Sequence, residues 1–147
     1  MSTPRPWPPP PRGAISLGSR ERSLCVALEG LALLHVLGGL AWPLLVVGTT
    51  LVDRWIPQVA EHRFWAALIG PTIASWGLLF WFGVRHGLRR GQRWVCDALI
   101  AALLTWLPLD FALCYAFRFW PGAILDPAFG LTMLLLLLML RPRLLVD

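Results

Sequence analysis

The sequence predicts an all-α, polytopic membrane protein with four transmembrane helices in a bundle and both termini in the cytoplasm. The first observation behind this prediction is a set of four long apolar stretches, at about 23–52, 64–84, 94–116 and 122–140. The second is the composition, because 57% of the residues are hydrophobic and the mean hydropathy is +0.65. Hydrocarbon offers no hydrogen-bond partner to the backbone, so each stretch should form a helix.

The third observation is the distribution of arginine, which accounts for all thirteen basic residues. Ten of the arginines lie in the N-terminal segment, the middle connection and the C-terminal end, and three lie in the other two connections. Basic loop residues are retained on the cytoplasmic side, so this bias predicts a multi-pass protein of the bacterial inner (plasma) membrane. The net charge of +5 is then explained by topology, and no fold that binds nucleic acid is indicated.

The chain divides into a tail and a bundle. Residues 1–20 are rich in Pro and Arg, and we expect them to form a disordered cytoplasmic tail, either simply solvated or docked to a partner. An uncleaved first helix should follow this tail. Residues 21–147 should form the four-helix bundle, which leaves no soluble domain large enough to be an enzyme.

The first stretch is too long for a hydrocarbon core of about 30 Å, so we expect it to tilt or bend. Prolines should bend the first three helices at Pro43, Pro71 and Pro108. In the fourth stretch, Asp126 and Pro127 have the pattern of an N-cap and a first helical residue. A helix that began there would be short for a span, so we expect the turn from Gly122 to extend it.

Small residues at a spacing of four indicate where helices pack closely. Such residues occur at Ala66, Gly70 and Ala74 in the second stretch and at Ala98 and Ala102 in the third. Small side chains allow two backbones to approach each other, so both faces should contact neighbouring helices.

Charged residues within the spans are costly and need an explanation. Glu29 and Asp97 lie near the cytoplasmic ends of the first and third helices, at a depth similar to that of Arg85, Arg89 and Arg141. One interpretation is a structural cluster of ion pairs, and the other is a proton or cation site that uses the two carboxylates.

Four residues are candidates for ligand binding. His35 lies near the bilayer centre, with Trp76 and Trp106 also deep in the membrane and Asp110 following on the face of Trp106. His35 could be a haem ligand or a proton relay, or could bond to a backbone carbonyl or a nearby hydroxyl group. Asp110, with Asp126, Glu61 and His62 nearby, could bind a metal or a polar substrate, although a pair with Arg118 would also explain it.

No motif assigns a catalytic residue, a metal site or a cofactor to this chain. The histidines and carboxylates do not have the close spacing of metal ligands. We interpret the three cysteines, Cys25, Cys96 and Cys114, as small buried hydrophobic side chains. The cofactor, if any, is therefore left open by the sequence.

The segment GLRRGQRW at 87–94, followed by WLPLD at 106–110, resembles small four-helix inner-membrane proteins of bacteria that are similar to DoxX. Such proteins have an Arg-rich turn that ends in Arg-Trp, and then a helix with a Pro and an Asp. The resemblance implies a four-helix bundle with both termini inside. It assigns no catalytic residue.

Three functions fit these observations. The first is a non-enzymatic accessory or structural subunit that packs against a larger membrane complex or against itself. The second is a binder or carrier of a small apolar or amphipathic molecule, such as a lipid, a quinone or a pigment. The third is a small membrane enzyme that uses Glu29, Asp97 or Asp110. The expected partners are the lipid bilayer and either other membrane subunits or a second copy of the chain.

Overall fold

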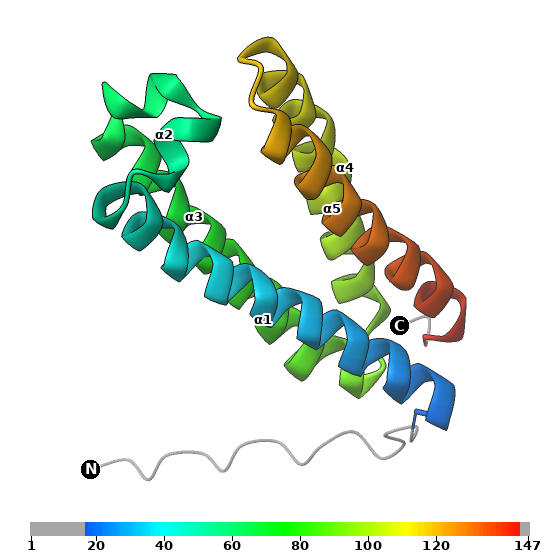
Figure 1. Cartoon of the computed structure of the whole chain (residues 1–147). Helices are drawn as coiled ribbons and strands as arrows, with labels where there is room; N and C mark the ends of the chain where they lie inside the picture. The colour runs from blue at the N-terminus through cyan, green and yellow to red at the C-terminus, as the bar shows by residue number, and fades with distance from the viewer. Residues whose placement is uncertain (1–16, 145–147) are drawn as a thin grey trace, which may run out of the picture.

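The computed structural model describes residues 17–144, and they fold almost entirely into helices (Figure 1). The α-helices are α1 (Ser19–Gly48), α2 (Leu51–Trp55), α3 (Arg63–Phe82), α4 (Arg93–Ala116) and α5 (Trp120–Leu140). Short 3-10 segments lie at Pro57–Ala60, Leu88–Arg90 and Arg141–Arg143, and a π-helical turn at Gly83–Gly87 continues α3.

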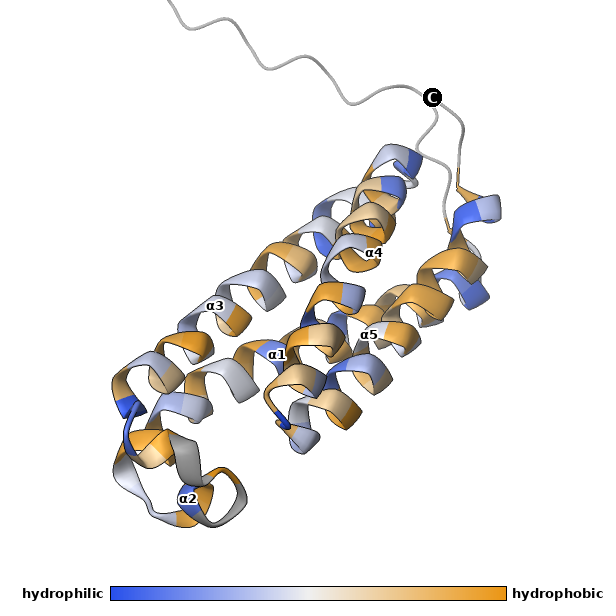
Figure 2. Ribbon diagram, turned by 90° about the horizontal axis from the view of Figure 1, so that it is seen from above, coloured by the Kyte–Doolittle hydropathy of each residue, from blue (hydrophilic) through white to orange (hydrophobic). Residues whose placement is uncertain are grey.

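The predicted fold class is confirmed, since the chain is an all-α, multi-pass membrane protein. Four helices are long and apolar enough to cross a membrane, namely Ser19–Gly48, Arg63–Arg90, Arg93–Ala116 and Trp120–Arg143. Figure 2 shows apolar residues along all four, as a lipid environment requires. The predicted tail at 1–20 falls mainly on residues 1–16, which lie outside the described part of the chain.

The long helices form two antiparallel pairs, α1 with α3 and α4 with α5 (Figure 1). The pairs meet where α1 begins, where α3 turns into α4 and where α5 ends, and we call this region the arginine-rich end. They diverge toward the α1–α3 and α4–α5 connections, which we call the open end. Each pair is referred to below as a hairpin.

The first hairpin is held by direct backbone contact. A Cβ atom added to Gly39 would lie 2.5 Å from the carbonyl oxygen of Gly70, and one added to Gly77 would lie 2.9 Å from that of Ala32. Gly70 and Ala74 are buried, so the close contact predicted for this stripe is confirmed.

The small residues of α4 behave differently. Ala98 and Ala102 are exposed, so the close contact predicted for them is not made by any helix in the described part of the chain. The α4–α5 contact uses another face of α4, where Leu107 packs against Gly130. Both faces are apolar, and hydropathy alone does not say which one meets protein.

Most of the core lies toward the arginine-rich end, where all four long helices meet. Its fully buried side chains come from each of them: Leu28, Phe80, Leu103 and Leu137. The three cysteines are free and buried, as predicted. Burial of each large apolar side chain is worth about 1.5–3 kcal/mol relative to water, although lipid reduces this gain for helices that are already inserted.

The turn between the hairpins depends on two glycines. Gly91 ends the 3-10 segment with a φ of 78°, a left-handed conformation that glycine adopts without strain. A Cβ atom on Gly87 would lie 2.6 Å from the side chain of Val95, so the absence of a side chain lets α4 approach the turn. The backbone N–H of Gln92 donates to the carbonyl oxygen of Gly87 at 3.2 Å and closes the reversal.

The start of α5 corrects one prediction. The helix begins at Trp120, with Pro121 in the first turn, so Asp126 lies inside α5 and is not its N-cap. Proline is tolerated in the first turn of a helix, and Pro121 occupies that place in α5 instead of Pro127, which lies six residues further along. The expected extension to about Gly122 is confirmed to within two residues.

Candidate ligand-binding site between the hairpins

An apolar cavity of about 310 Å³ lies at the open end and is lined by both hairpins. Trp42, Val52 and Ile56 line it from α1 and the segment that follows, and Phe119 and Pro121 line it from the α4–α5 turn. The rings of Trp42 and Phe119 lie 6.3 Å apart, centroid to centroid. This volume is at the lower end of the range for pockets that hold small molecules.

Trp42 is fixed in position by a hydrogen bond within the first hairpin. Its indole N–H donates to the carbonyl oxygen of Ala66 on α3 at 2.7 Å. The polar atom of the indole is therefore satisfied, and its apolar ring remains as a wall of the cavity.

Nearer the arginine-rich end, aromatic side chains from all four long helices meet. His35 lies 5.6 Å from Trp76 and 5.4 Å from Phe129, and Trp76 stacks on Trp106 at 5.5 Å with an interplanar angle of 27°. The structure thus brings together three of the four predicted ligand-binding residues. Phe129 was missed, because an isolated Phe in an apolar stretch has no distinctive sequence signal.

His35 is half-buried and bonded to its own helix. Its Nδ1 atom lies 3.0 Å from the carbonyl oxygen of Leu31. A carbonyl oxygen can only accept, so Nδ1 carries the hydrogen of this bond. His62 and His86 lie at opposite ends of the α3 span, so within residues 17–144 no second histidine joins His35.

The fourth predicted residue, Asp110, lies in a cluster with Cys114 and Asp126. The donor atoms of these three side chains lie within 4.8 Å of one another, and Cys114 Sγ lies 3.9 Å from Asp110 Oδ2. The predicted Asp110–Arg118 pair is wrong, because Arg118 is exposed and forms no ion pair within the described part of the chain.

Arg118 instead turns the backbone between α4 and α5, with a φ of 54°. Asp110 and Asp126 each lie eight residues from it, so an antiparallel hairpin centred on Arg118 places them side by side. This symmetry is a sequence signal that could have found the pair. The interpretation of Asp126 as a helix start concealed it.

The acid–thiol cluster (Asp110, Cys114, Asp126) adjoins the apolar cavity. A Cβ atom on Gly122 would lie 2.7 Å from the ring of Phe119 and 2.8 Å from Cys114 Sγ, so a cavity wall and the cluster flank the same glycine. On its other side, Trp106 lies one turn before Asp110 on α4. The cluster therefore lies between the cavity and the aromatic side chains.

Glu29 and Asp97, the two carboxylates singled out in the sequence, form separate ion pairs at the arginine-rich end. Glu29 is buried and accepts from Arg89 at 2.5 and 2.7 Å, with Arg85 at 3.8 Å. Asp97 pairs with Arg141 at 2.6 Å. Each carboxylate thus has an arginine of its own, which favours the structural interpretation over a shared proton or cation site.

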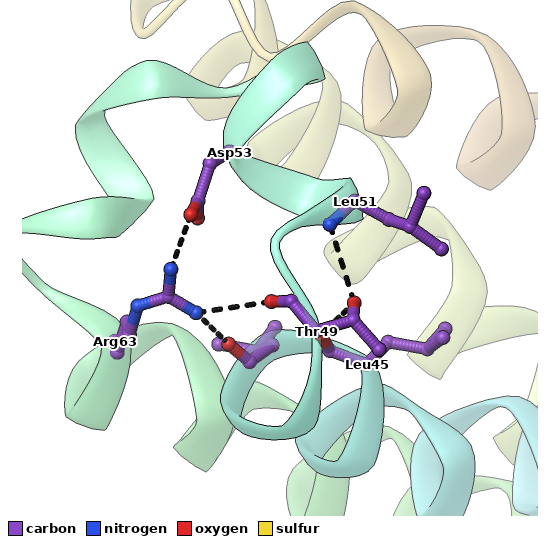
Figure 3. A network of polar contacts seen from close by, with 6 residues as sticks. Leu45, Thr49, Leu51, Asp53 and Arg63 are labelled. Carbon is purple, nitrogen blue, oxygen red and sulfur yellow. Dashed lines mark hydrogen bonds and ion pairs between the residues drawn. The ribbon is translucent and has the colours of Figure 1, made fainter.

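Polar contacts also fix the open end of the first hairpin (Figure 3). Arg63 donates to the carbonyl oxygens of Val46 and Thr49, the latter at 3.2 Å, and forms an ion pair with Asp53. These carbonyls belong to the end of α1, where no helical N–H is available to them. The network therefore holds the chain at the turn that brings Val52 to the cavity.

Comparisons with known proteins do not extend this description. No protein-family model, curated protein or solved structure matches the chain. The similarity to DoxX-like proteins stays a prediction from the sequence, and the function has to be argued from the geometry.

Proposed function

We propose that the protein is a non-enzymatic binder or carrier of a small apolar or amphipathic molecule, held between the two hairpins. The observation that carries this proposal is the apolar cavity lined by both hairpins at the open end. A surface shared by two separate structural units is a common place for a small-molecule site. The hairpins diverge toward this end (Figure 1), and Trp42 and Phe119 lie between them.

The lining indicates the class of ligand. Trp42 and Phe119 offer flat apolar surfaces, and the acid–thiol cluster beside them offers hydrogen-bonding groups. A molecule with an apolar body and one polar group, such as a lipid, a quinone or a pigment, matches this arrangement of apolar rings beside a polar cluster. The aromatic side chains beyond the cluster close the site toward the arginine-rich end.

A cavity-filling variant tests the proposal. Val52 is buried against the cavity, so Val52→Trp should fill it, whereas Val47 is 65% exposed near the end of α1 and does not line this cavity. Val47→Trp is the matched control. A short-chain quinone titrated into protein in lipid nanodiscs should quench tryptophan fluorescence with saturation for the wild type and for Val47→Trp, but not for Val52→Trp. Equal quenching in all three proteins would contradict the proposal.

Association with another membrane protein, or with a second copy, is the second candidate. It is favoured by Ala98 and Ala102, which have the spacing of a close-packing face and yet are exposed on α4. Ala102→Leu should then remove a partner that co-migrates with the protein in native gels, and Ala112→Leu, at another exposed position of α4, should not. Migration as a lone chain for the wild type would contradict this candidate.

We further propose that the protein resides in the bacterial inner membrane with its termini and the α3–α4 connection in the cytoplasm. The support is the arginine bias, with ten arginines on the proposed inner side and three on the outer side. Reporter fusions to the C-terminus and to the α4–α5 turn should report opposite sides. The same side for both would contradict a complete crossing by α5.

A further inference from the structure

The arginine-rich end carries more positive charge than its ion pairs use. Its three carboxylates, Glu21, Glu29 and Asp97, accept from Arg143, Arg89 and Arg141, respectively. Four further arginines form no ion pair within residues 17–144, and we call them the arginine rim: Arg20, Arg22, Arg90 and Arg93.

The arginine rim lies where the spans reach their ends. Arg20 and Arg22 are exposed in the first turn of α1, and Arg90 and Arg93 flank the turn before α4. Large exposed apolar side chains adjoin these arginines along the helices, such as Val26 at 57% and Trp94 at 62% exposure. A phospholipid presents the same order of groups, with an anionic headgroup at the interface and apolar chains beside the helix.

We propose that the arginine rim binds the phosphate groups of anionic phospholipids. A guanidinium group donates to two phosphate oxygens at once, which makes Arg suited to this contact. The four arginines lie at the ends of three apolar spans, Arg20 and Arg22 on the first, Arg90 on the second and Arg93 on the third. Arginines at the ends of membrane spans lie at the height of lipid headgroups, which favours lipid over a nucleic-acid strand. The alternative is that these arginines act only during insertion, where their charge sets the topology. That alternative predicts no preference among headgroups in the folded protein.

The test compares headgroups on the folded full chain. Protein is placed in nanodiscs of phosphatidylcholine mixed with phosphatidylglycerol, and the lipids that it retains are identified by native mass spectrometry. The lipids retained by the wild type should be enriched in phosphatidylglycerol over phosphatidylcholine. In the combined variant Arg90→Gln with Arg93→Gln, this enrichment should fall about fivefold for each arginine removed. The corresponding Lys variant should keep most of it.

Gln92→Ala, an uncharged change in the same turn as Arg90 and Arg93, is the matched control and should leave the preference unchanged. If the Arg90/Arg93 variant does not fold by circular dichroism, Arg20→Gln with Arg22→Gln tests the same inference on α1. Equal retention of the two lipids by the wild type, or a preference that neither glutamine variant reduces, would overturn it.

Discussion

The closest approach of α1 and α3 gives a sharp prediction at two adjacent glycines. A Cβ atom on Gly39 would lie 2.5 Å from the Gly70 carbonyl oxygen and 2.9 Å from Ala74 Cα, whereas one on Gly38 would meet nothing within 4 Å. Gly39→Ala should therefore disrupt the first hairpin, and Gly38→Ala should be tolerated. The two substitutions are chemically identical and neighbouring, so each controls for the other.

The change in the free energy of unfolding depends on which atoms the added methyl group contacts. In a helix interior, Ala is favoured over Gly by about 0.5–1 kcal/mol, and both variants gain this. At Gly39 the added methyl group meets backbone, which cannot rotate away as a side chain can, and overpacking of this kind costs about 1–3 kcal/mol. Gly38→Ala should thus raise the free energy of unfolding slightly, and Gly39→Ala should lower it by about 1–2 kcal/mol.

The assay is reversible unfolding in mild detergent micelles by added sodium dodecyl sulfate, followed by circular dichroism. The unfolding midpoint should fall for Gly39→Ala and stay or rise for Gly38→Ala. Equal midpoints, or a larger loss for Gly38→Ala, would refute the packing described for α1 and α3.

Three further predictions use the same assay or a simple extension of it. Glu29→Gln removes the charge that holds Arg89, so it should lower the free energy of unfolding by about 1.5–3 kcal/mol, and the exposed Glu61→Gln should change it little. Arg63→Met leaves the end of α1 without its donor, so amide hydrogen exchange should increase at Val52, and a rate equal to that of the wild type would contradict the network in Figure 3. Trp106→Ala breaks the stack on Trp76, so the near-UV circular dichroism should weaken while the far-UV signal persists, and an unchanged near-UV spectrum would count against the stack.

The four spans could be predicted because the bilayer imposes one local requirement on each of them. An apolar stretch of sufficient length must satisfy its own backbone and therefore becomes helical, whatever it packs against. The Gly70 and Ala74 stripe was predictable in the same way, since only small residues permit backbone contact. Glu29 and Arg89 could be anticipated as partners, because a buried carboxylate in a span needs a compensating charge.

The arrangement of the hairpins could not be predicted in this way. In lipid, a surface that faces another helix and a surface that faces acyl chains are both apolar, so Ala98 and Ala102 gave no indication that they point outward. The symmetry of Asp110 and Asp126 about Arg118 indicates their pairing only once it is known where the chain reverses, and that point is set by Arg118 and Pro121 together. The cavity depends in turn on Phe119 meeting Trp42, a contact between residues far apart in the sequence.

Purification of the protein from its native membrane in mild detergent, with mass analysis of what it retains, tests the central claim most directly. The wild type and Val47→Trp should carry a small apolar or amphipathic molecule, and Val52→Trp should be free of it. A molecule retained equally by all three proteins, or by none, would contradict a binding site between the hairpins.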